Sequence, residues 1–302
     1  MKKVLILGGT GYIGTNLALY LCNEYEVTVT GRKNTNKILS KNKNINFLKL
    51  KLSDVKLIND VADIYDIFIM LIPNTQPHNK VPDKEYELEE IINPTKQLFN
   101  LLVSKNKKII FSSTGGAVYG DSGNKTSKET DDCLPLNSYG EFKLELESHL
   151  QMLQKSNELN AAILRISNPY GGNFGGYFKS GFINNALHKL VLNATINIWG
   201  DGQQIRDYIH ILDLCEYIKR VLEISRFQLI NIGTGKGSNL INIVDEIFNV
   251  FGKKLDLAFD YDYFEKVSYN VLDIKKSEAL LSYSPKFYVT AGLEYEKNFN
   301  CE

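Results

Sequence analysis

Apolar and polar residues follow two distinct patterns along the first half of the chain. Short runs that are apolar throughout predict buried strands at residues 4–7, 27–30, 47–50, 67–71, 109–112 and 162–166. Longer stretches with apolar residues every three or four positions predict helices at 13–22, 54–61, 88–104 and 139–154. Because buried strands separated by helices are typical of a parallel sheet covered on both faces, the pattern predicts an α/β fold. With right-handed crossovers, this fold is a Rossmann-type doubly wound parallel sheet.

The alternation of apolar strands and amphipathic helices changes after about residue 168. Glycines cluster at residues 171–176, and the pattern beyond them predicts a helix at 182–192 and a short strand at 196–199. Further helices are predicted at 213–224 and 240–251. We therefore expect two domains: residues 1–168, which carry the sheet, and residues 169–302, a smaller C-terminal α/β lobe. Elements of the two are expected to interleave.

Composition and charge narrow the class of protein. The 302 residues include 35 Lys and Arg and 35 Asp and Glu, so the formal net charge is zero and no global field attracts a nucleic acid. The longest apolar run, residues 67–72, is too short to cross a bilayer. Four widely spaced cysteines without a Cys-x-x-Cys pair predict neither a metal site nor disulfides. We expect a cytoplasmic protein with no nucleic-acid, membrane or metal partner.

A glycine-rich loop directly follows the first predicted strand. Gly8, Gly11 and Gly14 have the spacing G-x-x-G-x-x-G and open the first predicted helix. Glycine permits a tight turn and lets a pyrophosphate approach the backbone, while the helix N-terminus offers N–H groups and a partial positive charge. The strand, loop and helix together predict a dinucleotide-binding site. Its expected contacts are Gly8, Thr10, Gly11, Tyr12, Ile13 and Gly14.

The segment after the second predicted strand bears on which dinucleotide binds. An acid normally ends this strand and bonds the adenosine ribose of NAD. Here residues 27–53 contain seven basic side chains and no acidic one, and Arg32 and Lys33 follow the strand. The forked guanidinium of Arg32 would suit a 2′-phosphate. This slightly favours NADP over NAD, although the same lysines could simply form a solvated surface.

Tyr139 and Lys143 lie four residues apart within a predicted helix and therefore share one face. A phenol with a pKa of about 10 is a poor base at neutral pH, and a nearby ammonium is expected to lower that pKa. Tyr139 could then exchange a proton with a sugar hydroxyl while a hydride passes to or from nicotinamide. A second hydroxyl group, from Thr114 or from Ser113, would bond the reacting oxygen.

Several motifs together resemble a known family across essentially the whole chain. They lie at residues 8–14, 112–120, 139–143, 165–171, 200–210 and 231–235. They are similar to those of the extended short-chain dehydrogenase/reductases, the NAD-dependent epimerase/dehydratase family that acts on sugar nucleotides. The resemblance is strongest to the bacterial UDP-glucose 4-epimerase-like group of surface-polysaccharide pathways. It implies a homodimer that binds a nucleotide-diphosphate sugar.

The resemblance also implies residue roles. Tyr139 would be the acid and base, Lys143 its partner and a contact to the nicotinamide ribose, and Thr114 or Ser113 would assist at the C4 oxygen. Other residues are expected to contact the cofactor: Leu52, Ser53, Leu71, Ile72, Pro73, Ser112, Ile166 and Pro169. The substrate would be contacted by Asn168, Trp199, Arg206 and Tyr208, with Arg206 holding the diphosphate.

Departures from the family pattern leave the reaction open. The adenosine acid is missing, and an arginine that relatives often carry late in the chain is absent, so that Lys266 could replace it. The overall similarity favours a nucleotide-sugar 4-epimerase. Arg32 and the missing acid favour the alternative, an NADPH-dependent 4-keto-sugar reductase. A non-catalytic NAD(P)-binding regulator is a third possibility, although it would not need both Tyr139 and Lys143.

Overall fold

The computed structural model of the chain describes residues 1–33, 36–72, 84–156, 158–172, 181–261 and 267–299. The chain forms two compact units that interleave along the sequence. Unit 1 comprises residues 1–114, 137–164 and 218–230, and unit 2 comprises residues 115–136, 165–217 and 231–302. Among the described residues, no helix is both long and apolar enough to cross a membrane.

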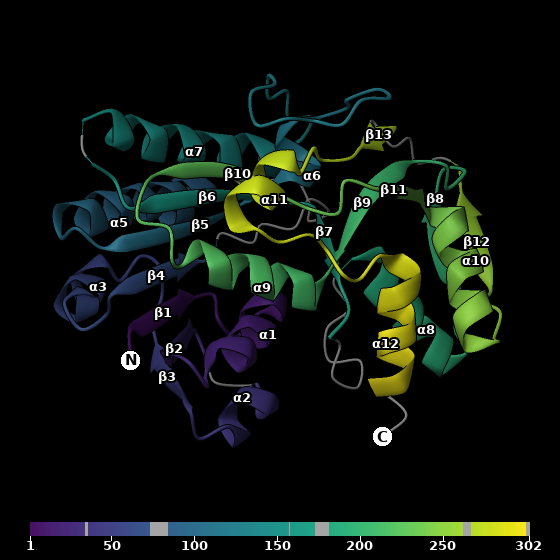
Figure 1. Cartoon of the computed structure of the whole chain (residues 1–302), viewed down its shortest axis with the longest axis horizontal. Coiled ribbons are helices and arrows are strands. Elements are labelled where there is room, and N and C mark those ends of the chain that lie inside the picture. Colours follow the sequence, from purple (N-terminus) through teal and green to yellow (C-terminus); the bar gives the residue numbers. More distant parts are fainter. Residues whose placement is uncertain (34–35, 73–83, 157, 173–180, 262–266, 300–302) are drawn as a thin grey trace. The chain divides into compact units, whose positions relative to one another are not determined.

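A seven-stranded sheet forms the centre of unit 1 (Figure 1). Its strands are β1 Lys3–Leu7, β2 Glu26–Gly31, β3 Ile45–Lys49, β4 Ile67–Met70, β5 Lys108–Thr114, β6 Ala161–Ile166 and β10 Gln228–Ile232. They lie in the order β10-β6-β5-β4-β1-β2-β3. Strands β1 to β5 pair in parallel. The predicted α/β doubly wound fold is confirmed, and the strand order reverses direction between β1 and β4.

The helices of unit 1 follow the predicted pattern with one local change. They are α1 Tyr12–Leu21, α2 Lys37–Lys41, α3 Val55–Ala62, α4 Lys84–Glu87, η1 Leu88–Ile92, α5 Asn93–Ser104 and α7 Ser138–Ser156, and α9 Ile211–Val221 ends in this unit. The single helix predicted at 88–104 instead begins with a π-helical segment, η1. Pro94 lies at the start of α5 and has no N–H to donate to the preceding turn, so the backbone widens there.

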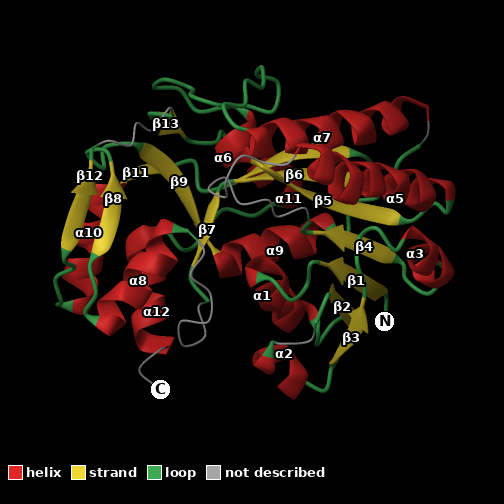
Figure 2. Ribbon diagram, turned by 180° about the vertical axis from the view of Figure 1, so that it is seen from behind, coloured by secondary structure: helices red, strands yellow, loops and turns green. Residues whose placement is uncertain are grey.

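The core of unit 1 explains why apolar strands and amphipathic helices alternate in this part of the chain. Helices α3, α5 and α7 bury apolar side chains against the sheet in one cluster. Phe99 of α5 packs edge-on against Phe111 of β5, with ring centroids 5.3 Å apart. Helices α5 and α7 lie side by side in both views (Figures 1 and 2). Helix α7 is thereby held against β5, which positions the residues predicted for catalysis.

Unit 2 is built around strand β9, Ile205–His210. β9 pairs in parallel with β7 Asn168–Tyr170 and β13 Tyr269–Asn270, and antiparallel with β11 Gly237–Asn239. Strands β8 Ile196–Trp199 and β12 Leu257–Asp260 form a separate parallel pair. The helices that lie wholly in this unit are α6 Gly115–Val118, α8 Phe182–Leu192, α10 Leu240–Phe251, α11 Lys275–Leu281 and α12 Val289–Phe299.

A fully buried carboxylate, that of Asp207, joins three segments of unit 2. It accepts hydrogen bonds from the backbone N–H and the hydroxyl of Thr234, at 2.9 and 2.8 Å, and from the N–H groups of Gly235 and Leu272, at 3.1 and 3.4 Å. A Cβ on Gly233 would lie 2.5 Å from this carboxylate. The motif at 231–235 therefore serves to hold Asp207, because only glycine leaves room for the carboxylate there.

Candidate active site

The glycine loop has the geometry of a phosphate cradle. Gly8 adopts a φ of 80°, and α1 begins after Gly11, which provides no side-chain cap to the first N–H groups of the helix. A Cβ on Gly9 would lie 2.6 Å from Val29, and one on Gly14 would lie 2.5 Å from the Cα of Gly9. No acidic residue occupies the first turn of α1. The loop therefore offers backbone N–H groups and the positive end of a helix dipole to an anion, as a dinucleotide requires.

Several predicted cofactor contacts come together where the strand order reverses. The N–H of Leu71 donates to the carbonyl of Leu7 at 3.0 Å, and a Cβ on Gly8 would lie 2.8 Å from Ile72. The residues after β1 and after β4 therefore flank the same point, which is where doubly wound sheets bind ligands. Leu52 is half-buried and Ser53 is exposed. Pro73 lies outside the described residues.

The segment after β2 is anchored by a residue that the sequence analysis missed. Asn36 is 1% exposed, and its amide donates to the hydroxyl of Thr15 at 2.6 Å while its carbonyl caps α2. A Cβ on Gly31 would lie 2.7 Å from the hydroxyl of Thr10, so this segment packs tightly against the glycine loop. Arg32 is exposed. The available signal was an asparagine directly before a short helix, the usual place of an N-cap.

Tyr139, Lys143 and Glu147 lie at four-residue intervals on α7. Lys143 is 2% exposed, and its Nζ donates to the carbonyl of Ser112 at 2.7 Å. The same nitrogen lies 5.0 Å from the ring centroid of Phe111 and 5.8 Å from that of Tyr139. The structure thus brings phenol, ammonium and the end of β5 together within unit 1, as predicted for Tyr139, Lys143 and Ser112.

Burial shifts the pKa values of both Lys143 and Tyr139. Burial lowers the pKa of Lys143 to about 7, and the negative charge of Glu147 opposes that shift. Burial raises the pKa of Tyr139 to about 12. In the protein by itself the pKa of Tyr139 is therefore raised, opposite to the net shift expected from the sequence. The cause of the upward shift is the loss of hydration that the phenolate suffers on burial.

The two hydroxyl candidates of β5 differ in their partners. Ser113 is 3% exposed, and its hydroxyl donates to the carboxylate of Glu147 in a short hydrogen bond. Thr114 is half-buried at the end of the strand. Glu147, which is 0% exposed, was not predicted as a site residue from the sequence. Its place four residues after Lys143 was the signal, because acids at that spacing share a helical face with the lysine.

The predicted substrate residues lie in unit 2 and differ in exposure. The guanidinium of Arg206 is half-buried and donates to the carbonyls of Ile205 and Val267 at 2.9 and 2.8 Å. The amide of Asn168 donates to the carbonyl of Asp207 at 2.9 Å. Tyr208 is 4% exposed within the apolar cluster of unit 2, so its ring serves the packing of this unit. Burial raises the pKa of its hydroxyl, and the charge of Arg206 opposes that shift.

Two of the remaining predicted residues of unit 2, Ile166 and Trp199, lie at strand ends. Ile166 ends β6 and is 3% exposed, and Pro169 in β7 is half-buried. Trp199 ends β8 and is 36% exposed, opposite Asp260 of β12. Lys266, named as a replacement for the missing arginine, lies outside the described residues.

Two further features bear on what the described residues can bind. Within the described ranges, no three His, Cys, Asp or Glu side chains are grouped so that they could hold a metal ion.

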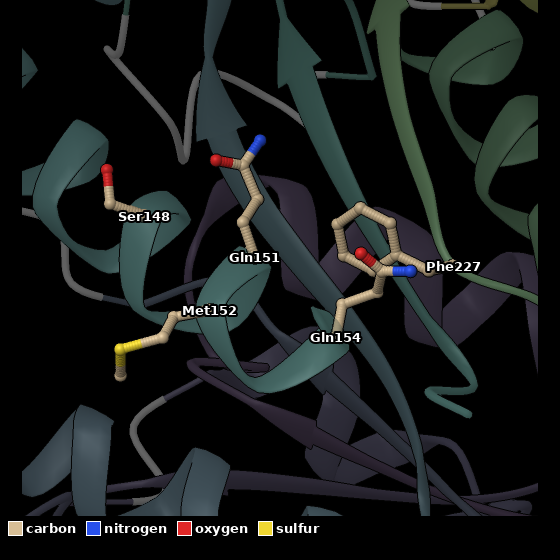
Figure 3. Close-up of a pocket in the computed structure, with 5 residues that line it drawn as sticks. All are labelled: Ser148, Gln151, Met152, Gln154 and Phe227. Atoms are coloured by element: carbon tan, nitrogen blue, oxygen red, sulfur yellow. The ribbon is translucent and has the colours of Figure 1, made fainter. Parts of the chain in front are cut away.

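A cavity of about 410 Å³ in unit 1 is lined by four α7 residues and by Phe227 (Figure 3). The α7 residues are Ser148, Gln151, Met152 and Gln154. None of the residues predicted for catalysis or binding lines this cavity.

Comparison with known proteins agrees with this geometry. The sequence profile described as the NAD dependent epimerase/dehydratase family matches residues 4–233. A dTDP-4-dehydro-6-deoxyglucose reductase of Escherichia coli is 30% identical over 96% of this chain and 95% of its own. A UDP-glucose 4-epimerase of Bacillus subtilis is 29% identical over 85% and 84%. The crystal structure of the Thermotoga maritima UDP-glucose 4-epimerase with UDP-glucose superposes with a TM-score of 0.89 at 24% identity, covering 99% of this chain and 98% of that one. The expected family resemblance is confirmed.

Proposed function

The chain belongs to the NAD-dependent epimerase/dehydratase family, and from this premise we propose that it is a nucleotide-sugar 4-epimerase. It would act by transient oxidation at C4 of a nucleotide-diphosphate sugar. The observation that carries the proposal is the placement of Tyr139 and buried Lys143 beside the end of β5, in the unit that also contains the glycine loop. A relative of B. subtilis that matches most of this chain is a UDP-glucose 4-epimerase.

The residues present fit a nicotinamide dinucleotide. Gly8, Gly9 and Gly14 leave space that a Cβ would fill, and the uncapped start of α1 suits a pyrophosphate. When bound, the nicotinamide would take a hydride from C4 of the sugar and return it. Lys143 would hold the nicotinamide ribose through its ammonium, which points to the end of β5.

Proton transfer to and from the C4 oxygen would be carried out by Tyr139. With a pKa of about 12, Tyr139 carries its proton at neutral pH and is ready to donate it to a C4 oxygen. To accept the proton in the oxidation step, it needs added positive charge nearby, and the ammonium of Lys143 is one source of that charge. Thr114 would donate a hydrogen bond to the same oxygen, because the Ser113 hydroxyl is already bonded to Glu147.

For the substrate we propose contacts from unit 2. The guanidinium of Arg206 is half-buried in unit 2, and its planar fork suits the oxygens of a diphosphate. The exposed ring of Trp199 could pack against a nucleobase or sugar, and Asn168 would contact the sugar. Buried Tyr208 would support Arg206 from within the core rather than contact the ligand widely.

The second candidate is an NADPH-dependent 4-keto-sugar reductase. Two observations favour it: the E. coli relative at 30% identity is a dTDP-4-dehydro-6-deoxyglucose reductase, and exposed Arg32 follows β2 where an acid would select NAD. The two candidates need different cofactor behaviour. The epimerase keeps its cofactor and returns the hydride, whereas the reductase consumes NADPH in each turnover.

The purified protein can distinguish the candidates. It is first denatured, and any released cofactor is identified by chromatography. It is then incubated with UDP-, dTDP- and GDP-sugars and their 4-keto forms, with and without NADPH. Isomer formation without added cofactor is expected. Net reduction that requires NADPH would support the reductase instead, and the absence of both reactions would contradict the assignment as an enzyme.

A further inference from the structure

Glu147 is a buried acid whose negative charge has no role in the mechanism above. Its side chain has no solvent exposure, and it lies on the same face of α7 as Tyr139 and Lys143. It accepts a short hydrogen bond from the hydroxyl of Ser113 on β5. A carboxylate is rarely buried without a compensating partner, because removing its charge from water is costly. The position of this acid therefore calls for a functional explanation.

The surroundings of Lys143 give that explanation. Its ammonium lies between the carbonyl of Ser112 and the ring of Phe111, and the side chain is only 2% exposed to solvent. The titratable groups of the described residues that face it are Tyr139 and Glu147 on α7, while β5 contributes only the carbonyl and the ring. Glu147 is thus the one negative charge among them that favours the protonated form of the lysine.

We propose that Glu147 is a positioning residue, whose charge keeps Lys143 protonated and whose oxygen holds the Ser113 hydroxyl away from the reacting centre. This inference rests on the roles proposed above for Tyr139 and Lys143. The charge preserves the cation that Tyr139 needs as a proton acceptor. The hydrogen bond leaves Thr114 as the hydroxyl that can reach the substrate.

Two substitutions separate the charge from the hydrogen bond. Glu147→Gln removes the charge but keeps an oxygen that can accept from Ser113. Ser113→Ala removes the hydrogen bond but keeps the charge. Glu141→Gln is the matched control, because this substitution also replaces a carboxylate by an amide, at an exposed position of the same helix. Thermal melting first establishes that each variant is folded.

The first measurement does not depend on turnover. Lysine labelled with ¹³C at Cε is followed by NMR across pH in the free protein, and the Lys143 signal is assigned from its absence in Lys143→Arg. Loss of an opposite charge moves such a midpoint by about one to three pH units. We expect the Lys143 midpoint to fall in Glu147→Gln and to stay unchanged in Ser113→Ala and Glu141→Gln.

The second measurement is the pH profile of kcat/KM with the sugar nucleotide that the wild type converts. As the Lys143 midpoint falls, the alkaline limb is expected to move to lower pH in Glu147→Gln, with about a tenfold loss for each pH unit of movement. In Ser113→Ala the pH profile should stay unchanged, because the charge of Glu147 is kept. An unmoved NMR midpoint in folded Glu147→Gln, or an equal movement in Ser113→Ala, would overturn the proposal. Absence of turnover in the wild type would contradict the proposed function but leave the NMR result decisive for Glu147.

Discussion

Two buried carboxylates, Glu147 in unit 1 and Asp207 in unit 2, have the same exposure and different surroundings. Both are 0% exposed. Asp207 accepts four hydrogen bonds from Thr234, Gly235 and Leu272, and so it ties three segments of backbone together. Glu147 accepts from the hydroxyl of Ser113 and lies on the same face of α7 as Lys143, whose protonated form its charge favours. Burial alone does not identify a functional acid, because the partners decide whether its charge serves the fold or the chemistry.

This contrast predicts that changes on the α7 face reduce activity and spare stability. Tyr139→Phe is expected to lower kcat by about 10²- to 10⁴-fold, the usual contribution of a general acid or base, with an unchanged melting temperature. Steady-state assays of sugar-nucleotide conversion and thermal melting measure both. Tyr65→Phe is the control, because Tyr65 packs edge-on against Phe68 of unit 1 and should retain activity. Full turnover by Tyr139→Phe would contradict its catalytic assignment.

At Asp207 the opposite balance is expected. Asp207→Ala leaves buried N–H groups without an acceptor and should lower the free energy of unfolding by about 3 to 5 kcal/mol. Urea denaturation measures this change. Asp201→Ala is the matched control, because Asp201 is exposed and accepts from the N–H of Gln203 at 2.9 Å, so its loss should cost about 1 kcal/mol or less. Equal losses of stability in the two variants would contradict the structural role of Asp207.

The glycine loop tests whether close packing, without any charge, supports a binding site. Gly14→Ala places a Cβ against the backbone of Gly8 and Gly9, so the loop must shift, and we expect a loss of about 1 to 3 kcal/mol in unfolding free energy. NAD affinity should fall with it. Gly11→Ala is the comparison, because its Cβ would approach only the Gly8 carbonyl, at 3.3 Å. Calorimetric melting and titration with NAD compare the stability and the NAD affinity of the two variants. Equal stability of Gly14→Ala and Gly11→Ala would show that the loop tolerates a methyl group at position 14.

The smallest expected effect concerns Arg32, whose charge is exposed rather than buried. If Arg32 holds a 2′-phosphate, Arg32→Ala should weaken NADPH binding about tenfold and leave NAD binding unchanged, because one charge-assisted contact is lost. Fluorescence titration with NADPH and with NAD measures the ratio of the two dissociation constants. Lys37→Ala removes a nearby positive charge from α2 and serves as the control. An unchanged ratio in Arg32→Ala would favour NAD as the cofactor.

Much of unit 1 follows from local pattern. The six predicted strands occur in the sheet with bounds that differ by one or two residues, because apolar runs flanked by helices have few other stable arrangements. Strand β10, Gln228–Ile232, was missed. Its apolar residues are too few for a distinct periodicity, and its neighbour in the sheet, β6, lies far away in the sequence. Asn36 and Glu147 were missed for a similar reason, since their partners come from other elements.

The order of residues along the chain was sufficient for the doubly wound sheet, the glycine loop and the shared helical face of Tyr139 and Lys143. Each depends on spacing within a short segment, and spacing is a local property. The electrostatics depended on folding. Burial in the folded chain lowers the pKa of Lys143 and raises that of Tyr139 to about 12, and the packing of α7 against β5 gives Ser113 the partner Glu147. Hydration is lost only where distant segments meet, so pKa values and the roles of buried acids were decided by the tertiary structure.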